Sequence, residues 1–315
     1  MPSCSLWDES PLPAWSQLRR RLRDDPDVWS LLRDAIYQHP ATSGRLVGLR
    51  ARRPERPSDS TWFTGTWVPG NTGVLVKVNI TQREQFWMSA ASQATTDIVP
   101  RVLASDSSLG ELGVAWLVLE WLPYGYDPEW RPAAFSSLLE AAARFQVFAA
   151  SVDTRLIYEE GIGTIRNWAL RGRDLCPEAG VVVRNLERDW AWVTAVAGPE
   201  VMFGDLHFGN AAFRNPPPHP RALLFDPIPR RQPWPFEPAY FEVLCGGSGL
   251  VRQMAAIRAA QNRPTCGPGQ IDRLAILYCG WMALLWWGIL PQNRPDAAWR
   301  TRLTSYVTAA ARLDR

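Results

Sequence analysis

Three oxygen-bearing side chains, Asp205, Asn210 and Asp226, are the best candidates for chemistry in this chain. Asp205 and Asn210 lie in the loop GDLHFGN, and two short apolar runs, AAFR and ALLF, lead from there to Asp226. Such runs around a proline-rich turn predict a hairpin that returns Asp226 to the end where the loop lies. Carboxylate and amide oxygens gathered there suit a hard divalent cation such as Mg²⁺. Asp and Asn also cap turns, so a purely structural loop is the competing interpretation.

Lys77 adds a cation to this set. The chain contains 33 arginines and one lysine, which lies in the strand-like run VLVKVN. A lone lysine among so many arginines indicates a position that needs a compact ammonium group, although an ordinary strand lysine is the alternative. We expect Lys77 to neutralise nucleotide phosphates and Asp205 to accept the proton of an acceptor hydroxyl. With Asn210 and Asp226 holding Mg²⁺, the set predicts phosphoryl transfer.

Glu84 is the expected partner of Lys77. It is the only acidic residue between Lys77 and Asp97, so it is placed to orient the ammonium group by an ion pair. It also completes the capping-box pattern TQRE that begins at Thr81, and this helix-starting role is the alternative.

The patterns before residue 122 predict a small α+β lobe. Two short amphipathic helices are expected in the first 40 residues, the first over residues 12–22. Three strand-like runs then follow between residues 45 and 79, and a helix is expected over residues 81–94. The runs VPRVLASD and AWLVLEWL bring the expected strands to five.

Helical patterns dominate after residue 122. Ser137 and Glu140 form a capping box that predicts a helix start, and VVVRNLERDWAWVTAVA predicts a helix that ends at Gly198. The run LAILYCGWMALLWWGIL is uncharged but short for a membrane span, so it favours a buried helix. We therefore expect a nucleotide-binding lobe over residues 1–121 and a helical lobe with the catalytic loop and substrate site over residues 122–315.

The amino-acid composition excludes several other classes of protein. The formal charge of +3 is too small for a polycationic nucleic-acid or membrane-surface protein. The 5 cysteines include no CxxC pair, and the 3 histidines lack metal-ligand spacing, so neither a disulfide framework nor a zinc site is expected. The first residues lack the basic start and apolar run of a signal peptide. These features indicate a cytoplasmic protein, monomeric or homodimeric, with no nucleic acid or membrane partner.

In these motifs the chain resembles the aminoglycoside phosphotransferase family, the small-molecule relatives of protein kinases. GDLHFGN followed by LLFDP matches the Asp-x-x-x-x-Asn loop of that family and its second metal-binding aspartate. The stretches FDPIP and EPAYFEVL are similar to those of the streptomycin- and hydroxyurea-type kinases. The resemblance covers about residues 45–300. It implies an α+β, bilobal protein-kinase-like fold with a small antiparallel-sheet N-terminal lobe and a mainly helical C-terminal lobe.

The resemblance also implies a nucleotide site. ATP or GTP would be the phosphate donor with Mg²⁺, and the backbone from Glu120 to Leu122 in WLVLEWLPYG would face the purine. Two departures from the family pattern stand out. Phe203 occupies the place of the histidine that usually precedes Gly-Asp, and RRQPWP lengthens the stretch between Asp226 and Glu237, near the expected approach of an acceptor.

Charge suggests the class of acceptor. From Asp205 onward the chain has 13 arginines and 7 acidic residues, whereas a polycationic aminoglycoside would need a surplus of carboxylates. We therefore expect a small-molecule antibiotic of neutral or anionic glycosylated or nucleoside type, and a role in resistance or self-resistance. Most of the 17 tryptophans should be core, but four in this half could stack on such an acceptor: Trp234, Trp281, Trp286 and Trp287. The alternatives are a primary-metabolism kinase of a sugar or choline-like substrate and a non-catalytic pseudokinase that binds nucleotide.

Overall fold

The computed structural model describes residues 25–52, 60–95, 97–153, 155–289 and 297–313. The chain divides into two compact units. The first contains the residues up to Pro123 together with Phe225–Pro227, and the second contains Tyr124–Leu224 and Ile228–Arg315. The expected first helix, over residues 12–22, and the loop over residues 53–59 lie outside the described residues.

A five-stranded antiparallel sheet forms the centre of the first unit. Its strand order is β1-β2-β3-β5-β4, and each hydrogen-bonded neighbour runs in the opposite direction. The strands are β1 Leu46–Arg52, β2 Thr61–Trp67, β3 Thr72–Ile80, β4 Val102–Asp106 and β5 Ala115–Glu120. All five predicted strands are present. Valines and leucines of β3 and β5, together with Trp116, are buried and form the core of this unit.

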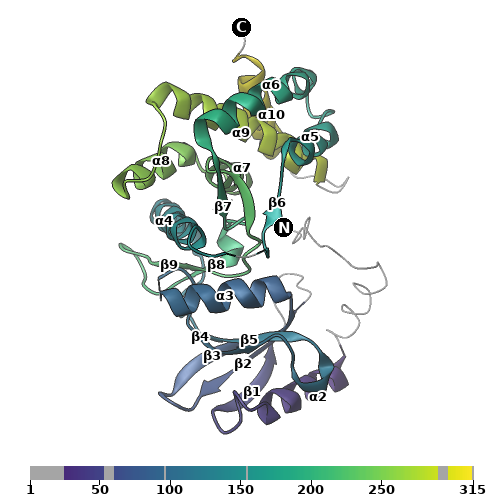
Figure 1. Ribbon diagram of the computed structural model, residues 1–315, viewed down its shortest axis with the longest axis vertical. Helices are drawn as coiled ribbons and strands as arrows, with labels where there is room; N and C mark the ends of the chain where they lie inside the picture. The colour runs from purple at the N-terminus through teal and green to yellow at the C-terminus, as the bar shows by residue number, and fades with distance from the viewer. Residues whose placement is uncertain (1–24, 53–59, 96, 154, 290–296, 314–315) are drawn as a thin grey trace. The chain divides into compact units, whose positions relative to one another are not determined.

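Two helices pack on this sheet. Helix α2 (Pro26–Gln38) is the second of the two helices expected in the first 40 residues, with the Asp25 carboxylate accepting from the Asp27 N–H and Pro26 in the first turn. Helix α3 (Gln82–Ala94) contacts β4 and β5 (Figure 1) and starts at Thr81, whose hydroxyl accepts from the Glu84 N–H at 3.0 Å. The predicted cap at Thr81 is confirmed.

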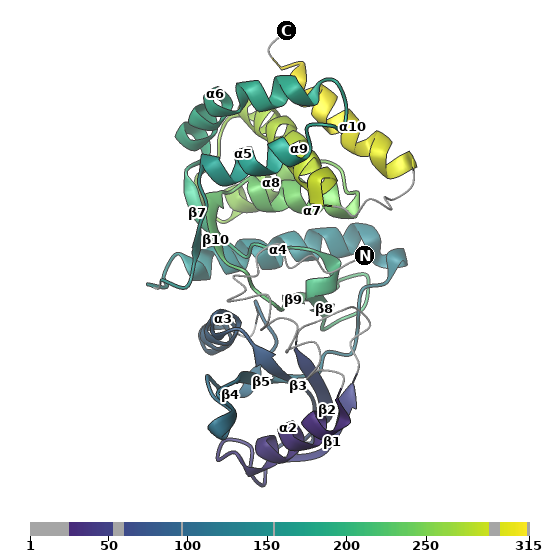
Figure 2. The same cartoon turned by 90° about the vertical axis from the view of Figure 1, so that its right-hand side faces the viewer.

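The second unit is mainly helical. Its helices are α4 Arg131–Ala149, α5 Ile162–Arg171, α6 Ala179–Ala197, α7 Phe236–Cys245, α8 Leu250–Ala260, α9 Pro268–Ile289 and α10 Ala297–Ala311. Helix α9 is buried from Leu277 to Trp287, because α5, α7 and α10 all pack against it (Figure 2). The prediction of a buried core helix is confirmed. None of the helices in the described part of the chain combines the length and apolarity needed to cross a bilayer.

The start of α4 differs from the prediction. The helix begins at Arg131, six residues before Ser137. Ser137 is buried within the helix, and its hydroxyl accepts from the Ala222 N–H at 2.7 Å. The Ser137–Glu140 pattern is therefore not a capping box, because the serine oxygen serves strand β9 (Ala222–Leu224) instead of the helix start.

Two small sheets complete the second unit. Strands β8 (Ala211–Phe213) and β9 form the predicted hairpin, with Ala211 opposite Leu224. A three-stranded sheet, not predicted from the sequence, has the order β6-β10-β7. Its strands are β6 Tyr158–Glu159, β7 Pro199–Met202 and β10 Arg230–Pro233. The RRQPWP segment therefore contributes a buried strand instead of an open loop.

Candidate active site

The first unit places a buried lysine between two carboxylates. Lys77 lies in the middle of β3, and its side chain is 3% exposed. Its Nζ donates to Glu84 Oε1 at 2.6 Å and also bonds Asp226 Oδ1. The Asp226 side chain is 38% exposed, so the most accessible member of this cluster is a carboxylate. The predicted ion pair between Lys77 and Glu84 is present.

The side chain of Glu84 forms the expected ion pair, whereas only its backbone takes part in the helix start. Its backbone N–H bonds the Thr81 hydroxyl, while its side chain accepts from Lys77. Burial alone would lower the pKa of Lys77, but the charges of Asp226 and Glu84 outweigh burial and raise it above its ordinary value. Lys77 therefore carries a positive charge at every physiological pH.

Asp226 has an unusual backbone. Its φ is +57°, in the left-handed region that residues with a Cβ rarely adopt. Such a conformation persists where surrounding contacts impose it, and it is often found at functional sites. The carboxylate of this residue bonds Lys77.

The expected hinge follows β5. The Glu120 N–H donates to the Arg101 carbonyl at 2.9 Å, and the Glu120 carboxylate accepts from the Arg101 N–H at 3.0 Å. The next N–H, of Trp121, donates to the Gly73 carbonyl at 2.8 Å. Glu120 thus fastens the start of β4 to the end of β5, and Leu122 follows, half-buried. That this backbone faces a purine stays a prediction.

In the second unit, Asp205 lies in a loop whose polar groups converge on its carboxylate. The Tyr240 hydroxyl donates to Asp205 Oδ1 at 2.6 Å. The Asn210 amide donates to Asp205 Oδ2 at 2.9 Å and to the Asp205 carbonyl at 3.1 Å. The structure therefore brings together the predicted Asp205 and Asn210 and adds Tyr240, which the sequence did not single out.

The environment of Asp205 favours the ionised form of its carboxylate. Burial opposes its ionisation, but His207, Tyr240 and Arg230 together favour the charged form, and its pKa is lowered from the ordinary value. His207 Nε2 lies 3.5 Å from Asp205 Oδ2, and its Nδ1 accepts from the Gly209 N–H at 2.9 Å. His207 thus shapes the loop and faces the carboxylate, and that Asp205 is the base stays a prediction.

Asn210 and Asp226 are suited in type to hold Mg²⁺. Because the Asn210 amide nitrogen is turned to Asp205, the amide oxygen is the atom of this side chain that is left for a cation. Among the described residues, no three His, Cys, Asp or Glu side chains are grouped to bind a metal. Mg²⁺ commonly takes one or two protein oxygens and completes its shell with water and phosphate. Each of these two side chains is therefore suited in type to a cation that arrives with a nucleotide, and that they hold Mg²⁺ stays a prediction.

Helix α7 and Phe203 support the start of the Asp205 loop. Glu237 is 1% exposed, and its Oε1 accepts from the Gly204 N–H at 3.0 Å. Gly204 has a φ of +96°, and a Cβ there would lie 1.8 Å from the Ile228 carbonyl oxygen, so no other residue fits. Phe203 is fully buried with its ring 5.4 Å from that of Phe145. Where the resemblance implies a bracing histidine, this chain thus braces the loop by apolar packing.

Arg230 is a further residue that sequence patterns missed. It is fully buried on β10 and donates to Glu160 Oε1 at 2.7 Å, and Gln232 also donates to Glu160, at 3.2 Å. A Cβ on Gly204 would lie 2.9 Å from Arg230 Nε, so this guanidinium lies against the backbone beside Asp205. The RRQPWP insertion marked the segment, but an arginine in a loop-like sequence gives no sign of burial.

Paired arginines correct the charge argument for the acceptor. Five arginines that follow Asp205 in the sequence pair with carboxylates that precede it: Arg230 with Glu160, Arg231 with Glu159, Arg258 and Arg263 with Glu200, and Arg273 with Asp189. Dividing the sequence at Asp205 separated these cations from their partners. The free positive charge is therefore smaller than the sequence count suggests, and the preference for a neutral or anionic acceptor stays a prediction.

The four tryptophans proposed for stacking are all buried. Trp234 and Trp281 are each 2% exposed or less. The Trp287 indole N–H donates to Asp174 Oδ1 at 3.0 Å. The Trp286 ring lies 5.4 Å from that of Tyr240, a residue that bonds Asp205. These tryptophans are part of the core, in agreement with the prediction for most of the 17.

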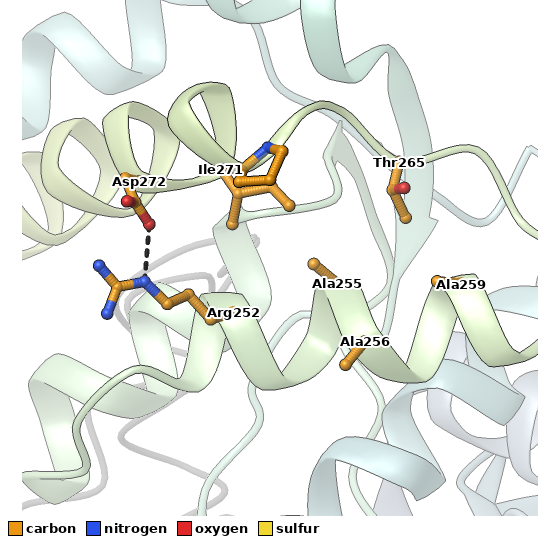
Figure 3. Close-up of a pocket in the computed structure, with 8 residues that line it drawn as sticks. Arg252, Ala255, Ala256, Ala259, Thr265, Ile271 and Asp272 are labelled. Carbon is orange, nitrogen blue, oxygen red and sulfur yellow. Dashed lines mark hydrogen bonds and ion pairs between the residues drawn. The ribbon is translucent and has the colours of Figure 1, made fainter.

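A separate hollow lies between α8 and the start of α9 (Figure 3). Its volume is about 440 Å³, and three alanines of α8 form its floor: Ala255, Ala256 and Ala259. Its two charged residues, Arg252 and Asp272, pair with each other at 2.6 Å. None of the predicted site residues lines this hollow, so it is not part of the candidate active site.

Comparison with known proteins identifies the fold. No family model and no curated protein matches the sequence. The solved structure of a choline/ethanolamine kinase family protein from Mesorhizobium loti has 14% identity and a TM-score of 0.56, over 90% of this chain and 95% of that chain. Choline kinase from Cryptosporidium parvum Iowa II has 9% identity and a TM-score of 0.58, over 91% and 96% of the two chains.

An aminoglycoside phosphotransferase structure gives the same result. A thermostable mutant solved in a ternary complex with ADP and hygromycin B has 14% identity and a TM-score of 0.53, over 85% of this chain and 96% of that chain. Likeness at such identities establishes the fold. The predicted α+β protein-kinase-like fold, with a small antiparallel sheet in one unit and mainly helices in the other, is confirmed.

Proposed function

We propose that this protein is an enzyme that transfers the terminal phosphoryl group of ATP or GTP to a hydroxyl group of a small molecule. The observation that carries the proposal is Lys77, the single lysine of the chain, which is buried and bonded to both Glu84 and Asp226. Phosphoryl-transfer enzymes of the kinase type use a strand lysine with a helix glutamate and a metal-binding aspartate. The structures that share the fold are named as kinases or phosphotransferases, and one of them holds ADP.

Each residue has a defined task in this reaction. Lys77 neutralises phosphate oxygens of the donor, and Glu84 fixes the direction of its ammonium group. Asp205, an anion with both oxygens held, accepts the proton of the acceptor hydroxyl as the oxygen bonds to phosphorus and the nucleoside diphosphate leaves. Asn210 and Asp226 hold Mg²⁺, which supplies further neutralisation of the phosphate charge. Most of the catalytic effect is therefore electrostatic.

We propose an antibiotic hydroxyl as the first acceptor class, with choline-like amino alcohols as the alternative. The motifs around Asp226 and Glu237 resemble those of antibiotic kinases, and one structure with this fold holds hygromycin B. Other structures with the fold are named as choline, ethanolamine or aminopropanol kinases, which supports the alternative. Since several arginines of the second unit pair with carboxylates, both cationic and neutral acceptors belong in the test.

The test is transfer of label from nucleotide to acceptor. The full chain is incubated with Mg²⁺, γ-labelled ATP or GTP, and hygromycin B, streptomycin, a neutral nucleoside antibiotic, choline or ethanolamine. Label on at least one acceptor is the expected result. Tight nucleotide binding without transfer to any of them would favour the pseudokinase, whereas absence of nucleotide binding with Mg²⁺ would overturn the proposal.

A further inference from the structure

Helix α7 contacts the Asp205 loop at two points that are one turn apart. Glu237 accepts from the Gly204 N–H at 3.0 Å, and Tyr240 donates to Asp205 Oδ1 at 2.6 Å. Residues three positions apart lie on the same face of a helix, so both side chains extend toward the loop. One contact holds the backbone before Asp205, and the other holds its side chain.

Tyr240 is itself fixed in place. Its side chain is 2% exposed, and its ring stacks on Phe236 with centroids 5.9 Å apart. On another side it meets the ring of Trp286 at 5.4 Å. Burial, and then the charge of Asp205, raise the pKa of the phenol well above its ordinary value. The hydroxyl therefore keeps its proton and donates it to Asp205.

The two oxygens of Asp205 are held by different neutral donors. Tyr240 binds Oδ1, and the Asn210 amide binds Oδ2 at 2.9 Å. A carboxylate bonded at both oxygens cannot turn about its Cβ–Cγ bond without breaking one of these bonds. A general base works only within hydrogen-bond reach and alignment of the proton that it accepts, so its orientation affects the rate.

We infer that Tyr240 is a positioning residue whose hydroxyl fixes the orientation of the Asp205 carboxylate toward the acceptor. The catalytic part of this inference rests on the proposed phosphotransferase function, whereas the restraint on the loop does not. Loss of Tyr240 should slow the chemical step while leaving the binding of nucleotide intact, because Tyr240 acts through Asp205.

Tyr240→Phe tests the catalytic part. With the acceptor that the label-transfer panel identifies, kcat is expected to fall roughly tenfold to a hundredfold, and the KM for nucleotide to change less than about twofold. The matched control is Tyr278→Phe, which removes a buried hydroxyl of α9 that has no hydrogen-bond partner among the described residues. The control should retain the wild-type kcat. A Tyr240→Phe enzyme with wild-type kcat, or with a raised nucleotide KM as its main defect, would overturn the inference.

Hydrogen–deuterium exchange of the loop gives a second readout without an acceptor. Amides of residues 203–213 should exchange about tenfold faster in Tyr240→Phe than in the wild type or in Tyr278→Phe, because a bond that restrains the loop is lost. Unchanged exchange would overturn the positioning role. If the wild type transfers label to no acceptor while Tyr240→Phe still loosens the loop, the proposed function fails and the restraint stands.

Discussion

The two units hold their polar centres by opposite means. In the first, the Lys77 ammonium is fixed by ion pairs with Glu84 and Asp226. In the second, the Asp205 carboxylate is hydrogen-bonded by a hydroxyl of Tyr240 and an amide of Asn210, both neutral, while His207 and Arg230 favour its ionised form. An ion pair can exchange one partner for another charged group, whereas neutral donors keep the anion in place without cancelling its charge. We therefore expect the first centre to rearrange when phosphate and cation bind, and the second to keep its geometry.

The largest loss of label transfer should come from a change in the neutral-donor centre, which is Asp205 with Tyr240 and Asn210. Asp205→Asn removes the proton acceptor while keeping the shape of the side chain, and label transfer is expected to fall roughly 10²–10⁴-fold. Nucleotide affinity, measured by titration calorimetry, should be retained because the phosphate contacts lie elsewhere. Undiminished transfer would show that Asp205 is not the base.

The second-largest loss of activity should come from replacing the ion-paired cation, Lys77. Lys77→Arg keeps the charge but replaces a compact ammonium, 3% exposed between two carboxylates, by a wide planar group. We expect kcat/KM for nucleotide to fall roughly 10²-fold, measured with the same label transfer. Arg33→Lys, on the exposed face of α2, is the control and should have no effect. If Lys77→Arg is fully active, the compact ammonium is not what this position requires.

Stability distinguishes buried from exposed ion pairs within the second unit. Arg230→Gln leaves Glu160 buried without its charged partner, so the free energy of unfolding should fall by about 3–5 kcal/mol. Arg231→Gln removes the neighbouring pair with Glu159, whose side chains are 41% and 68% exposed, and should cost less than about 1 kcal/mol. Urea unfolding of both variants measures the difference, and equal losses would contradict it.

The pH dependence of stability tests Glu237, the ionisable group that supports the neutral-donor centre. Burial raises its pKa to about 7, against the hydrogen bonds from Gly204 and Gln146. Its contribution to stability is thus fully present below the unfolded pKa of 4.5 and is lost as pH rises through 7. Relative to Glu237→Gln, the wild type should lose roughly 2–3 kcal/mol between pH 5 and pH 8. A constant difference between the two proteins in urea unfolding would contradict the shifted pKa.

Local patterns explain what the sequence could predict. The five strands of the first unit are rich in valine, threonine and aromatic residues and are joined largely in sequence order, so each could be recognised from its own residues. The pair between Lys77 and Glu84 was predictable for the same reason, since a single acidic residue lies within reach.

Contacts between segments that are distant in the chain explain which features the sequence could not predict. Tyr240 and Asp205 are 35 positions apart, and a tyrosine that bonds a carboxylate looks like one that fills a core. Strand β10 contains arginines and a proline, which are poor strand signals, and β6 has two residues. The Ser137 pattern misled because its hydroxyl serves a strand that lies 85 positions away. Counting charges by sequence position overstated the free positive charge, because five arginines pair with carboxylates across the point where the sequence was divided.

The division of the chain into units has a consequence for the order in which the protein can assemble. Residues 225–227 belong to the first unit, although more than a hundred residues of the second unit precede them in the chain. A ribosome therefore releases the five-stranded sheet long before it releases Asp226. Until then, of the two carboxylates that bond Lys77 in the structure, the chain has only Glu84. The buried ammonium group therefore lacks one of its two negatively charged partners. Unlike a domain that folds from a continuous N-terminal segment, this unit gains its final charged group only after most of its neighbour has been synthesised.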